Sequence, residues 1–255
     1  MFNDQEYLNS PLEIEAELTS YFNQSEVKKV FDIGSCDGLD AIKYAKKFPN
    51  SIVYAFEPLS KNIQLIHNNI SKYNISSIIP VELALSNTRG KADFYVSSGR
   101  PNDIEGAEDW DFGNKSSSLL QPNKTIEVHP WLEFKENVTV NTDTLANFVV
   151  ENEISNIDFI HMDVQGAELM VLEGAKDFIS NIKMIWLEVE NIELYKNQPL
   201  ATDVEMFLIA NGFTKIKDTV NQIAGDQLWV NYSFFPKKKL THFMYKILRK
   251  IKILS

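Results

Sequence analysis

Short apolar runs alternate with amphipathic segments along most of this chain, and the two patterns predict different elements. The runs are rich in β-branched and aromatic residues and are typical of buried strands. They cover residues 29–33, 51–56, 77–83, 158–162 and 183–189. Between them, apolar positions recur at threes and fours, which predicts helices. These helices cover residues 39–48, 60–73, 142–150 and 167–179. The alternation predicts an α/β fold with a mostly parallel, doubly wound sheet and helices on both faces.

Signals at the two ends of this pattern predict further elements. Ser10 as N-cap, followed by Pro at N1 and Glu at N3, predicts a helix to about residue 22. Near the other end, a capping box of Thr202 and Glu205 opens another helix. The runs 213–216 and 227–232 are then expected to close the sheet as an antiparallel pair.

A long insertion interrupts the middle of the chain. The runs 92–96 and 138–141 are expected to pair as strands on either side of it. The insertion, about residues 97–137, also contains several ring side chains, namely Trp110, Phe112, His129, Trp131 and Phe134. Long loops in compact domains are usually lids or binding loops, so this one is expected to be a lid on the acceptor side of a site.

Composition favours a single domain in a reducing compartment. The chain has 255 residues and 44% apolar content, enough for one sizeable core over residues 29–235, with an N-terminal helical cap in residues 1–28. Cys36 is the only cysteine, so no intrachain disulfide can form. No signal-peptide pattern begins the chain, and no stretch reaches the ~20 apolar residues of a membrane span. We therefore expect a cytoplasmic protein.

Charge is distributed unevenly. Residues 236–255 contain seven Lys or Arg and no acid, so the net charge of −10 places −17 on the rest of the chain. An acidic body disfavours nucleic acid as a partner. The tail has apolar residues at threes and fours between its basic ones, which is typical of a helix on an anionic membrane surface or on a partner. A tail packed on its own domain stays the alternative.

The loop after the first strand indicates a nucleotide-type cofactor. Residues 32–38 read DIGSCDG, and Glu57 closes the next strand about 25 positions after Asp32, where an acid would bind ribose. Cys36 replaces the second glycine of the dinucleotide fingerprint, which disfavours nicotinamide cofactors, and no Walker loop occurs. S-adenosylmethionine, with a ribose but no phosphate, fits better.

Acids end several of the predicted strands. Asp163 follows the fourth strand and Glu188 lies near the end of the fifth, so both are expected at the carboxyl edge of the sheet, where ligands bind. Glu168 stands in the first turn of the next helix, where it either serves chemistry or compensates the helix dipole.

Six motifs in order make the chain similar to the FkbM-type methyltransferases. They are VFDIGSCDG, AFEP, LALSNTRG, NKSSSLL, DVQGAELMVLEGA and IWLEVE, between Val30 and Asn231. The resemblance implies a class I S-adenosylmethionine-dependent fold and O-methylation, commonly of sugar hydroxyls or related natural products. It also implies a cofactor site, whose expected residues are Asp32, Gly34, Ser35, Asp37, Gly38, Glu57, Pro58, Glu82, Ala84 and Asp163. Gln165 departs from the acid often found at its position, which puts a base or metal role there in doubt.

A hydroxyl acceptor needs a general base or a metal ion that lowers its pKa. Asp163 is the first candidate for the base, and Glu168 and Glu188 follow it. Clustered carboxylates could also hold Mg²⁺, although no metal ligands are assigned. Two alternatives stay open: a methyltransferase for another small molecule, a lipid or a protein, and a membrane-tethered cofactor-binding module without transfer activity.

Overall fold

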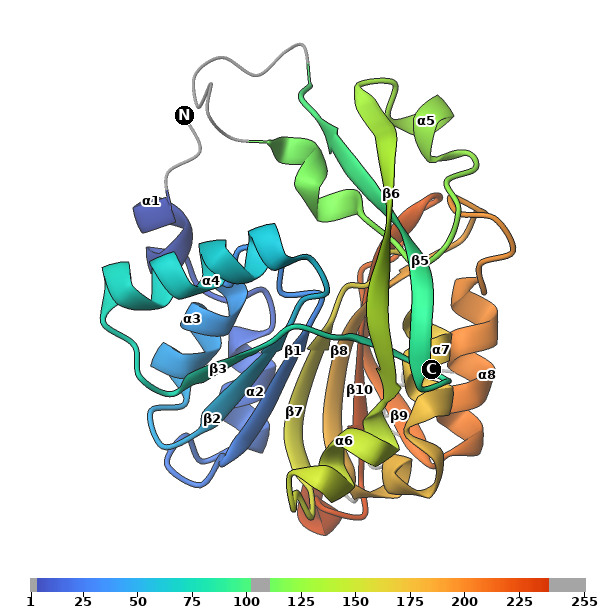
Figure 1. Ribbon diagram of the computed structural model, residues 1–255. Helices are drawn as coiled ribbons and strands as arrows, with labels where there is room; N and C mark the ends of the chain where they lie inside the picture. The colour runs from blue at the N-terminus through green and yellow to red at the C-terminus, as the bar shows by residue number, and fades with distance from the viewer. Residues whose placement is uncertain (1–3, 102–110, 239–255) are drawn as a thin grey trace, which may run out of the picture.

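The computed structural model describes residues 4–101 and 111–238. Its centre is a seven-stranded sheet in the order β3-β2-β1-β7-β8-β10-β9 (Figure 1). The strands are β1 (Lys29–Ile33), β2 (Ile52–Phe56), β3 (Ile78–Val81), β7 (Ile157–Met162), β8 (Ile182–Glu190), β9 (Phe213–Asp218) and β10 (Ala224–Asn231). Neighbouring strands are parallel except around β10, which is antiparallel to both β8 and β9. The predicted fold class, mostly parallel α/β with an antiparallel last strand, is confirmed.

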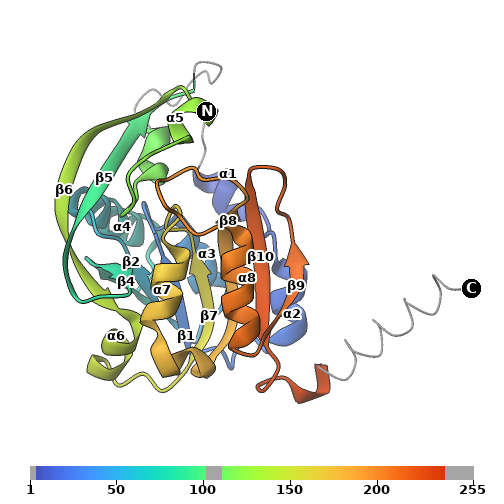
Figure 2. The same ribbon diagram turned by 90° about the vertical axis from the view of Figure 1, so that its right-hand side faces the viewer.

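Helices pack on both faces of this sheet (Figures 1 and 2). One face carries α1 (Asp4–Asn9), α2 (Glu15–Tyr21), α3 (Leu39–Lys47) and α4 (Ser60–Tyr73), and the other carries α6 (Leu145–Glu151), α7 (Glu168–Gly174) and α8 (Ala201–Ala210). Successive strand residues point to opposite faces, so Val30 joins the first core layer and Phe31 the second. Burial on both faces explains why these strands are almost continuously apolar.

A second, three-stranded sheet stands beside the first and has the order β4-β6-β5. Its strands are β4 (Ala84–Ser86), β5 (Gly90–Gly99) and β6 (Leu132–Thr144). Ala92 pairs with Val140 in an antiparallel ladder, so the predicted pairing around the insertion is confirmed, although both strands are longer than expected. Between them the described chain forms the 3₁₀ helix η1 (Phe112–Ser116) and the short helix α5 (Thr125–Val128).

Two predicted helix starts are wrong. Ser10 ends α1 instead of opening a helix, because its backbone N–H bonds to the carbonyl of Glu6, and α2 begins only at Glu15. In α8, Asp203 and not Glu205 provides the cap, since its carboxylate accepts the N–H of Leu200 at 2.8 Å. In both places several polar residues could cap a helix, and the surrounding packing selects among them.

Three predicted boundaries also move. The run expected over residues 77–83 ends at Val81, and Ala84–Ser86 joins the second sheet. β6 continues to Thr144, so α6 begins at Leu145. Finally, α7 stops at Gly174 and is followed by the 3₁₀ helix η2 (Lys176–Asn181), and Gly174 packs so closely on β4 that a Cβ there would lie 2.1 Å from the backbone oxygen of Ser86. The second sheet therefore limits where these helices can lie.

Some predicted features fall outside the described residues. These are residues 1–3 of the N-terminal cap, residues 102–110 of the insertion, including Trp110, and residues 239–255 of the basic tail. Within the two described ranges, no helix combines the length and the apolar character needed to cross a membrane.

Candidate active site

The turn after β1 brings β1 and β7 into backbone contact at the carboxyl edge of the sheet. Gly34 has a φ of +88°, a left-handed conformation that glycine adopts without steric cost. A Cβ built on Gly34 would lie 1.8 Å from the backbone oxygen of Asp163. The N–H of Asp163 also donates to the carbonyl of Ile33 at 2.9 Å. Only glycine fits at position 34, because any side chain there would clash with the backbone of Asp163.

Asp32 lies fully buried beneath this turn. Its carboxylate accepts a 2.5 Å hydrogen bond from the Ser35 hydroxyl, and Nδ1 of His161 lies 2.7 Å from its other oxygen. Burial alone would lower the pKa of His161, but the hydrogen bond to Asp32 and the charge of Asp32 outweigh burial and raise that pKa to about 9. Asp32 therefore pairs with both Ser35 and His161, and Asp32 and Ser35 are both predicted cofactor residues.

Glu57 follows β2 and lines a cavity at the same edge of the sheet. One carboxylate oxygen accepts the N–H of Leu59 at 2.9 Å and the other accepts the N–H of Cys36 at 3.1 Å. Burial raises the pKa of Glu57 to about 7, even though these hydrogen bonds favour the charged form. The side chain of Asn62 also gives this carboxylate a hydrogen bond. A carboxylate offers about four acceptor positions, so about one remains for a ligand.

Cys36 connects the β1 loop to the insertion. Its φ is +50°, a conformation uncommon for residues other than glycine, at the position where a dinucleotide fingerprint has its second glycine. Asn114 of η1 donates from Nδ2 to Oδ1 of Asn62 at 2.8 Å and to the Cys36 sulfur at 3.4 Å. No residue in the described ranges gives Oδ1 of buried Asn114 a hydrogen bond. That oxygen is free to receive a donor from a ligand.

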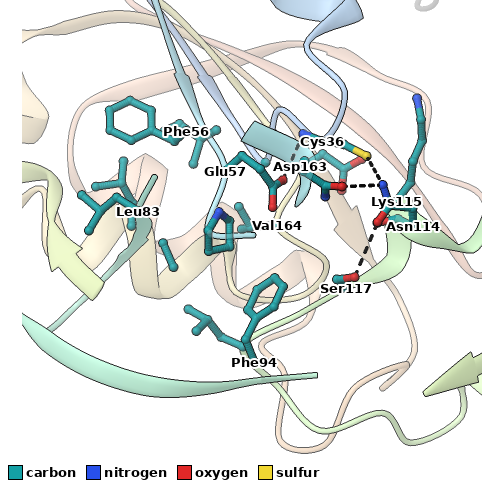
Figure 3. Close-up of a pocket in the computed structure, with 17 residues that line it drawn as sticks. Cys36, Phe56, Glu57, Leu83, Phe94, Asn114, Lys115, Ser117, Asp163 and Val164 are labelled. Carbon is teal, nitrogen blue, oxygen red and sulfur yellow. Dashed lines mark hydrogen bonds between the residues drawn. The ribbon is translucent and has the colours of Figure 1, made fainter. Parts of the chain in front are cut away.

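The first cavity is narrow: it leaves about 40 Å³ for the centre of a water-sized sphere, below the ~300–1,000 Å³ usual for small-molecule sites, although its empty space including the open mouth is about 520 Å³. Its two ends differ in polarity. Figure 3 shows Phe56, Leu83 and Phe94 toward one end, and Cys36, Asn114 and Lys115 toward the other. The described part of the insertion thus shares a cavity with Gly34 and Glu57, and its role as an acceptor-side lid stays a prediction.

Two of the remaining five predicted cofactor residues, Pro58 and Ala84, line the first cavity, and the other three do not. Glu82 is exposed, bonds to the Ser60 hydroxyl and lines a different surface cavity. Asp37 and Gly38 open α3: Asp37 accepts the N–H of Leu39 at 3.1 Å, and Gly38 takes a left-handed φ of +78° as the N-cap. Asp37 and Gly38 are not among the residues that line the cavity.

Asp163 follows β7 and its carboxylate is held by the next turn. Nε2 of Gln165 donates to Asp163 and also to Glu188, at 2.7 Å in each case. Oε1 of Gln165 accepts the hydroxyl of Tyr195 at 2.9 Å. Burial and the charge of Asp163 raise the pKa of Glu188 well above its usual range. The structure therefore brings two of the three predicted catalytic acids together through one amide.

Glu168, the third predicted acid, faces the backbone of its own loop. Its carboxylate accepts the N–H groups of Val164 at 3.0 Å and Gly166 at 3.3 Å, and burial raises its pKa to about 7. It does not line the first cavity. These bonds hold the turn that presents Asp163 and Gln165.

A second cavity meets the site at Asp163. It lies between the N-terminal segment, residues 7–14, and the edge of the sheet where β7 and β8 end and antiparallel β10 begins. Its empty space, including the mouth, is about 750 Å³. Asp163 is the residue that lines both cavities.

The donor set does not fit a metal ion. Within residues 4–101 and 111–238, no group of three or more His, Cys, Asp or Glu side chains is arranged to hold one. The amide nitrogen of Gln165 already satisfies both Asp163 and Glu188 where a bridging cation would stand. The Mg²⁺ that the sequence left open finds no support among the described residues.

Residues 32–215, well over half of the chain, match the family described as the Methyltransferase FkbM domain. The chain belongs to the FkbM methyltransferase family. The resemblance drawn from the sequence motifs is thereby confirmed, and this FkbM protein is a methyltransferase.

Individual relatives agree with this assignment. The 2-O-methyltransferase NoeI of Sinorhizobium fredii (strain NBRC 101917 / NGR234) is 29% identical over 189 residues, which cover 74% of each chain. Methyltransferase 1 of Beauveria bassiana (strain ARSEF 2860) is 22% identical over 149 residues, or 58% of each chain. The crystal structure of Methyltransferase FkbM from Methylobacillus flagellatus KT superposes with a TM-score of 0.51 at 14% identity. The match covers 89% of this chain but 50% of that one, so this FkbM chain spans about half the length of the solved protein.

Several residues of this FkbM site were not predicted from the sequence. Asn114 and Lys115 belong to the NKSSSLL motif, which carried the family resemblance without a stated role. His161 stands two positions before Asp163, and its pairing with buried Asp32 follows only from the β1–β7 register. Tyr195 had no sequence signal, because it lies in an irregular segment 30 residues after Gln165.

Proposed function

We propose that this FkbM methyltransferase transfers a methyl group from S-adenosylmethionine to a hydroxyl of a sugar, a glycan or a related natural product. The observation that carries the proposal is that Glu57 and Asp163 line one cavity. O-methylation needs an acid that recognises the ribose of the donor and a base for the acceptor hydroxyl. The similarity to a 2-O-methyltransferase supports a hydroxyl as the acceptor.

The residues of the first cavity fit S-adenosylmethionine. Glu57 keeps about one acceptor position after binding two backbone N–H groups and the Asn62 side chain, and this position would receive a ribose hydroxyl. Leu83, Ala84 and Phe94 would form an apolar wall for adenine, and Oδ1 of Asn114 would accept from an amino group. When bound, the cofactor supplies a methyl group on a positively charged sulfur.

Asp163 is the proposed general base. It would accept the proton of the acceptor hydroxyl at a distance of about 2.6–3.2 Å while Gln165 holds its second oxygen in place. Glu188 shares the amide of Gln165 and is the second candidate. Glu168 is the weakest candidate because its carboxylate already accepts two N–H groups of the loop.

The experiment combines donor binding with an acceptor screen. The protein is titrated calorimetrically with S-adenosylmethionine and S-adenosylhomocysteine, then supplied with the labelled donor and panels of sugars, other small hydroxy compounds, lipids and peptides. We expect donor binding and a methyl ether on the sugar panel. Transfer to another panel would replace the acceptor class, and donor binding without transfer to any panel would favour a binding module.

An Asp163→Asn variant tests the base in the same assay. We expect its donor affinity to stay within about threefold and its turnover to fall by about 10²–10⁴-fold, the usual contribution of general base catalysis. Asp177→Asn, on the exposed surface of η2, makes the same change away from the site. Near-normal turnover of Asp163→Asn would refute the assignment.

Cytosolic location is a further proposal, supported by the single cysteine of the chain. Reversible association with a membrane surface through residues 236–255 is another proposal, and the seven basic residues of that segment support it.

A further inference from the structure

We propose that the second cavity binds the acceptor and that its acidic lining selects a sugar or polyol without negative charge, with an amino sugar preferred. This inference rests on the proposed function, because it assigns the acceptor side of the same reaction. The cavity leaves about 300 Å³ for the centre of a water-sized sphere, at the lower end of the ~300–1,000 Å³ usual for small-molecule sites.

The position of the cavity suits an acceptor. Asp163 lines it and also lines the cavity that contains Glu57. A hydroxyl bound in the second cavity can therefore reach the proposed base without entering the space assigned to the donor. Transfer requires donor and acceptor to meet at one point, and Asp163 marks that point.

The walls combine aromatic surface with polar groups. Trp186 of β8 and Tyr7 of α1 contribute aromatic rings, and the Tyr7 hydroxyl bonds to Asp40 at the start of α3. Aromatic side chains with a polar tip pack well against ligands that have both C–H faces and hydroxyls. The bond between Tyr7 and Asp40 also ties the N-terminal segment to α3, and both residues line the cavity.

Asp226 of β10 provides the most specific indication of a ligand. It is half-buried, and its carboxylate receives no hydrogen bond from any residue in the ranges 4–101 and 111–238. Burial, together with the charge of Asp163, raises its pKa to about 6. A partly desolvated carboxylate without donors gains from a ligand that brings hydroxyl or ammonium groups.

The charge around the cavity is negative. Its carboxylates outnumber its cations, and His161 is already paired with buried Asp32. Lys43 adds a positive charge to the wall, where its Nζ lies 3.1 Å from the Ser10 hydroxyl and 4.4 Å from the centre of the Tyr7 ring. The acidic and basic residues in the lining are Glu13, Asp40, Lys43, His161, Asp163 and Asp226. Such a site attracts an amine and repels a uronate or phosphate group.

The test uses three matched probes: the methyl glycosides of glucose, glucosamine and glucuronic acid. Each is titrated calorimetrically into protein saturated with S-adenosylhomocysteine, and each is assayed for transfer from S-adenosylmethionine. We expect the glucosamine derivative to bind most tightly, the glucose derivative next and the glucuronate derivative most weakly. Asp226→Asn should weaken binding and raise the KM of the amino sugar by about 10–100-fold, the effect of losing a hydrogen bond between charged groups, with little change in kcat.

Two variants control this test. Asp177→Asn makes the same change at an exposed position on η2 and should change none of these values by more than about twofold. Asp226→Glu keeps the charge and should keep the preference for the amine. Unchanged affinity for S-adenosylhomocysteine shows that each variant is folded.

The outcomes separate the two proposals. If the glycosides bind in the expected order but no methyl ether forms, the proposed function fails and the assignment of the cavity holds. If transfer occurs but glucuronate is preferred, or Asp226→Asn behaves like Asp177→Asn, the inference is overturned while the proposed function stands. If Asp226→Asn does not fold, the order of the three probes on the unaltered protein decides.

Discussion

The side-chain nitrogen of Gln165 lies 2.7 Å from a carboxylate oxygen of Asp163 and donates a hydrogen bond to it. The same nitrogen donates to Glu188, while Oε1 of Gln165 accepts from Tyr195. Tyr195 in turn lies 2.8 Å from the backbone carbonyl of Ser116 in the insertion. Gln165 is therefore a positioning residue that links the proposed base to the insertion and keeps two carboxylates close together without a cation.

Replacing this amide by an acid should disturb Asp163 directly. Gln165→Glu places a third carboxylate between Asp163 and Glu188, and like charges raise carboxyl pKa values. We expect kcat to fall about tenfold or more and the acidic limb of the pH–rate profile to move to higher pH, with donor affinity retained. Pre-steady-state and steady-state rates measured from about pH 5 to about pH 9 test this, because that range includes the titration of a carboxyl group with a raised pKa.

Gln64→Glu is the matched control, because Gln64 is exposed on α4. It should leave the profile unchanged. If Gln165→Glu lowers kcat without moving the acidic limb, Gln165 only supports the fold of its turn and does not tune Asp163.

These residues show how far the sequence alone could lead. Asp163 was predicted because it follows a strand whose carboxyl end must lie at the ligand edge of a parallel sheet, a consequence of chain direction. Glu168 had two equal interpretations, and only the loop geometry shows that it binds the N–H groups of Val164 and Gly166. The contact of Tyr195 with Gln165 depends on packing between irregular segments, which no periodic pattern encodes.

A second prediction concerns the contact between Gly34 and Asp163. In Gly34→Ala the new Cβ would stand 1.8 Å from the Asp163 carbonyl oxygen, so the β1 and β7 ends must separate. We expect a loss of stability of about 3 kcal/mol or more, together with loss of donor binding, because rigid backbone cannot yield cheaply. Urea unfolding and calorimetric donor titration measure both effects.

Gly212→Ala isolates the clash from the backbone conformation. Gly212 has a φ of +84°, close to the +88° of Gly34, but a Cβ there would meet nothing within 4 Å. This control should cost only the strain of a left-handed residue, about 1–2 kcal/mol, and should retain donor binding. Equal effects of the two substitutions would contradict the steric explanation.

A third prediction follows from the buried pair of His161 and Asp32. The pKa of His161 is raised to about 9 from its ordinary 6.5, so the folded state holds a proton that the unfolded state releases. The stability from this pair is fully present below pH 6.5 and is lost as pH rises through 9, up to about 3 kcal/mol. Glu57, with its pKa raised by burial to about 7, acts in the same direction between pH 4.5 and 7.

Thermal unfolding measured at about pH 6, 7.5 and 9 should therefore show a melting temperature that falls as the pH rises through the raised pKa of His161. The contribution of His161 to this fall should be about 6–12 °C. His161→Gln should unfold at a lower temperature at pH 6 and show a flatter decline, because it cannot release that proton. His67→Gln, which changes an exposed histidine of α4, should keep the slope of the unaltered protein. Parallel curves for all three proteins would rule out His161 as the titrating group.

The last prediction concerns the basic segment 236–255, whose seven positive charges follow an acidic body. Phe235 is a suitable end point for a shortened chain, because its ring packs 5.2 Å from that of Tyr21 and 5.5 Å from that of Phe22. At ~1 kcal/mol per basic residue near anionic lipid, we expect the full chain to float with phosphatidylserine-containing vesicles at low salt and to be released as salt screens the charges.

The chain ending at Phe235 should stay unbound, and neither protein should float with purely zwitterionic vesicles. Equal flotation of the two proteins on anionic vesicles would assign membrane binding elsewhere, and no flotation of either would leave the segment to a partner or to its own domain.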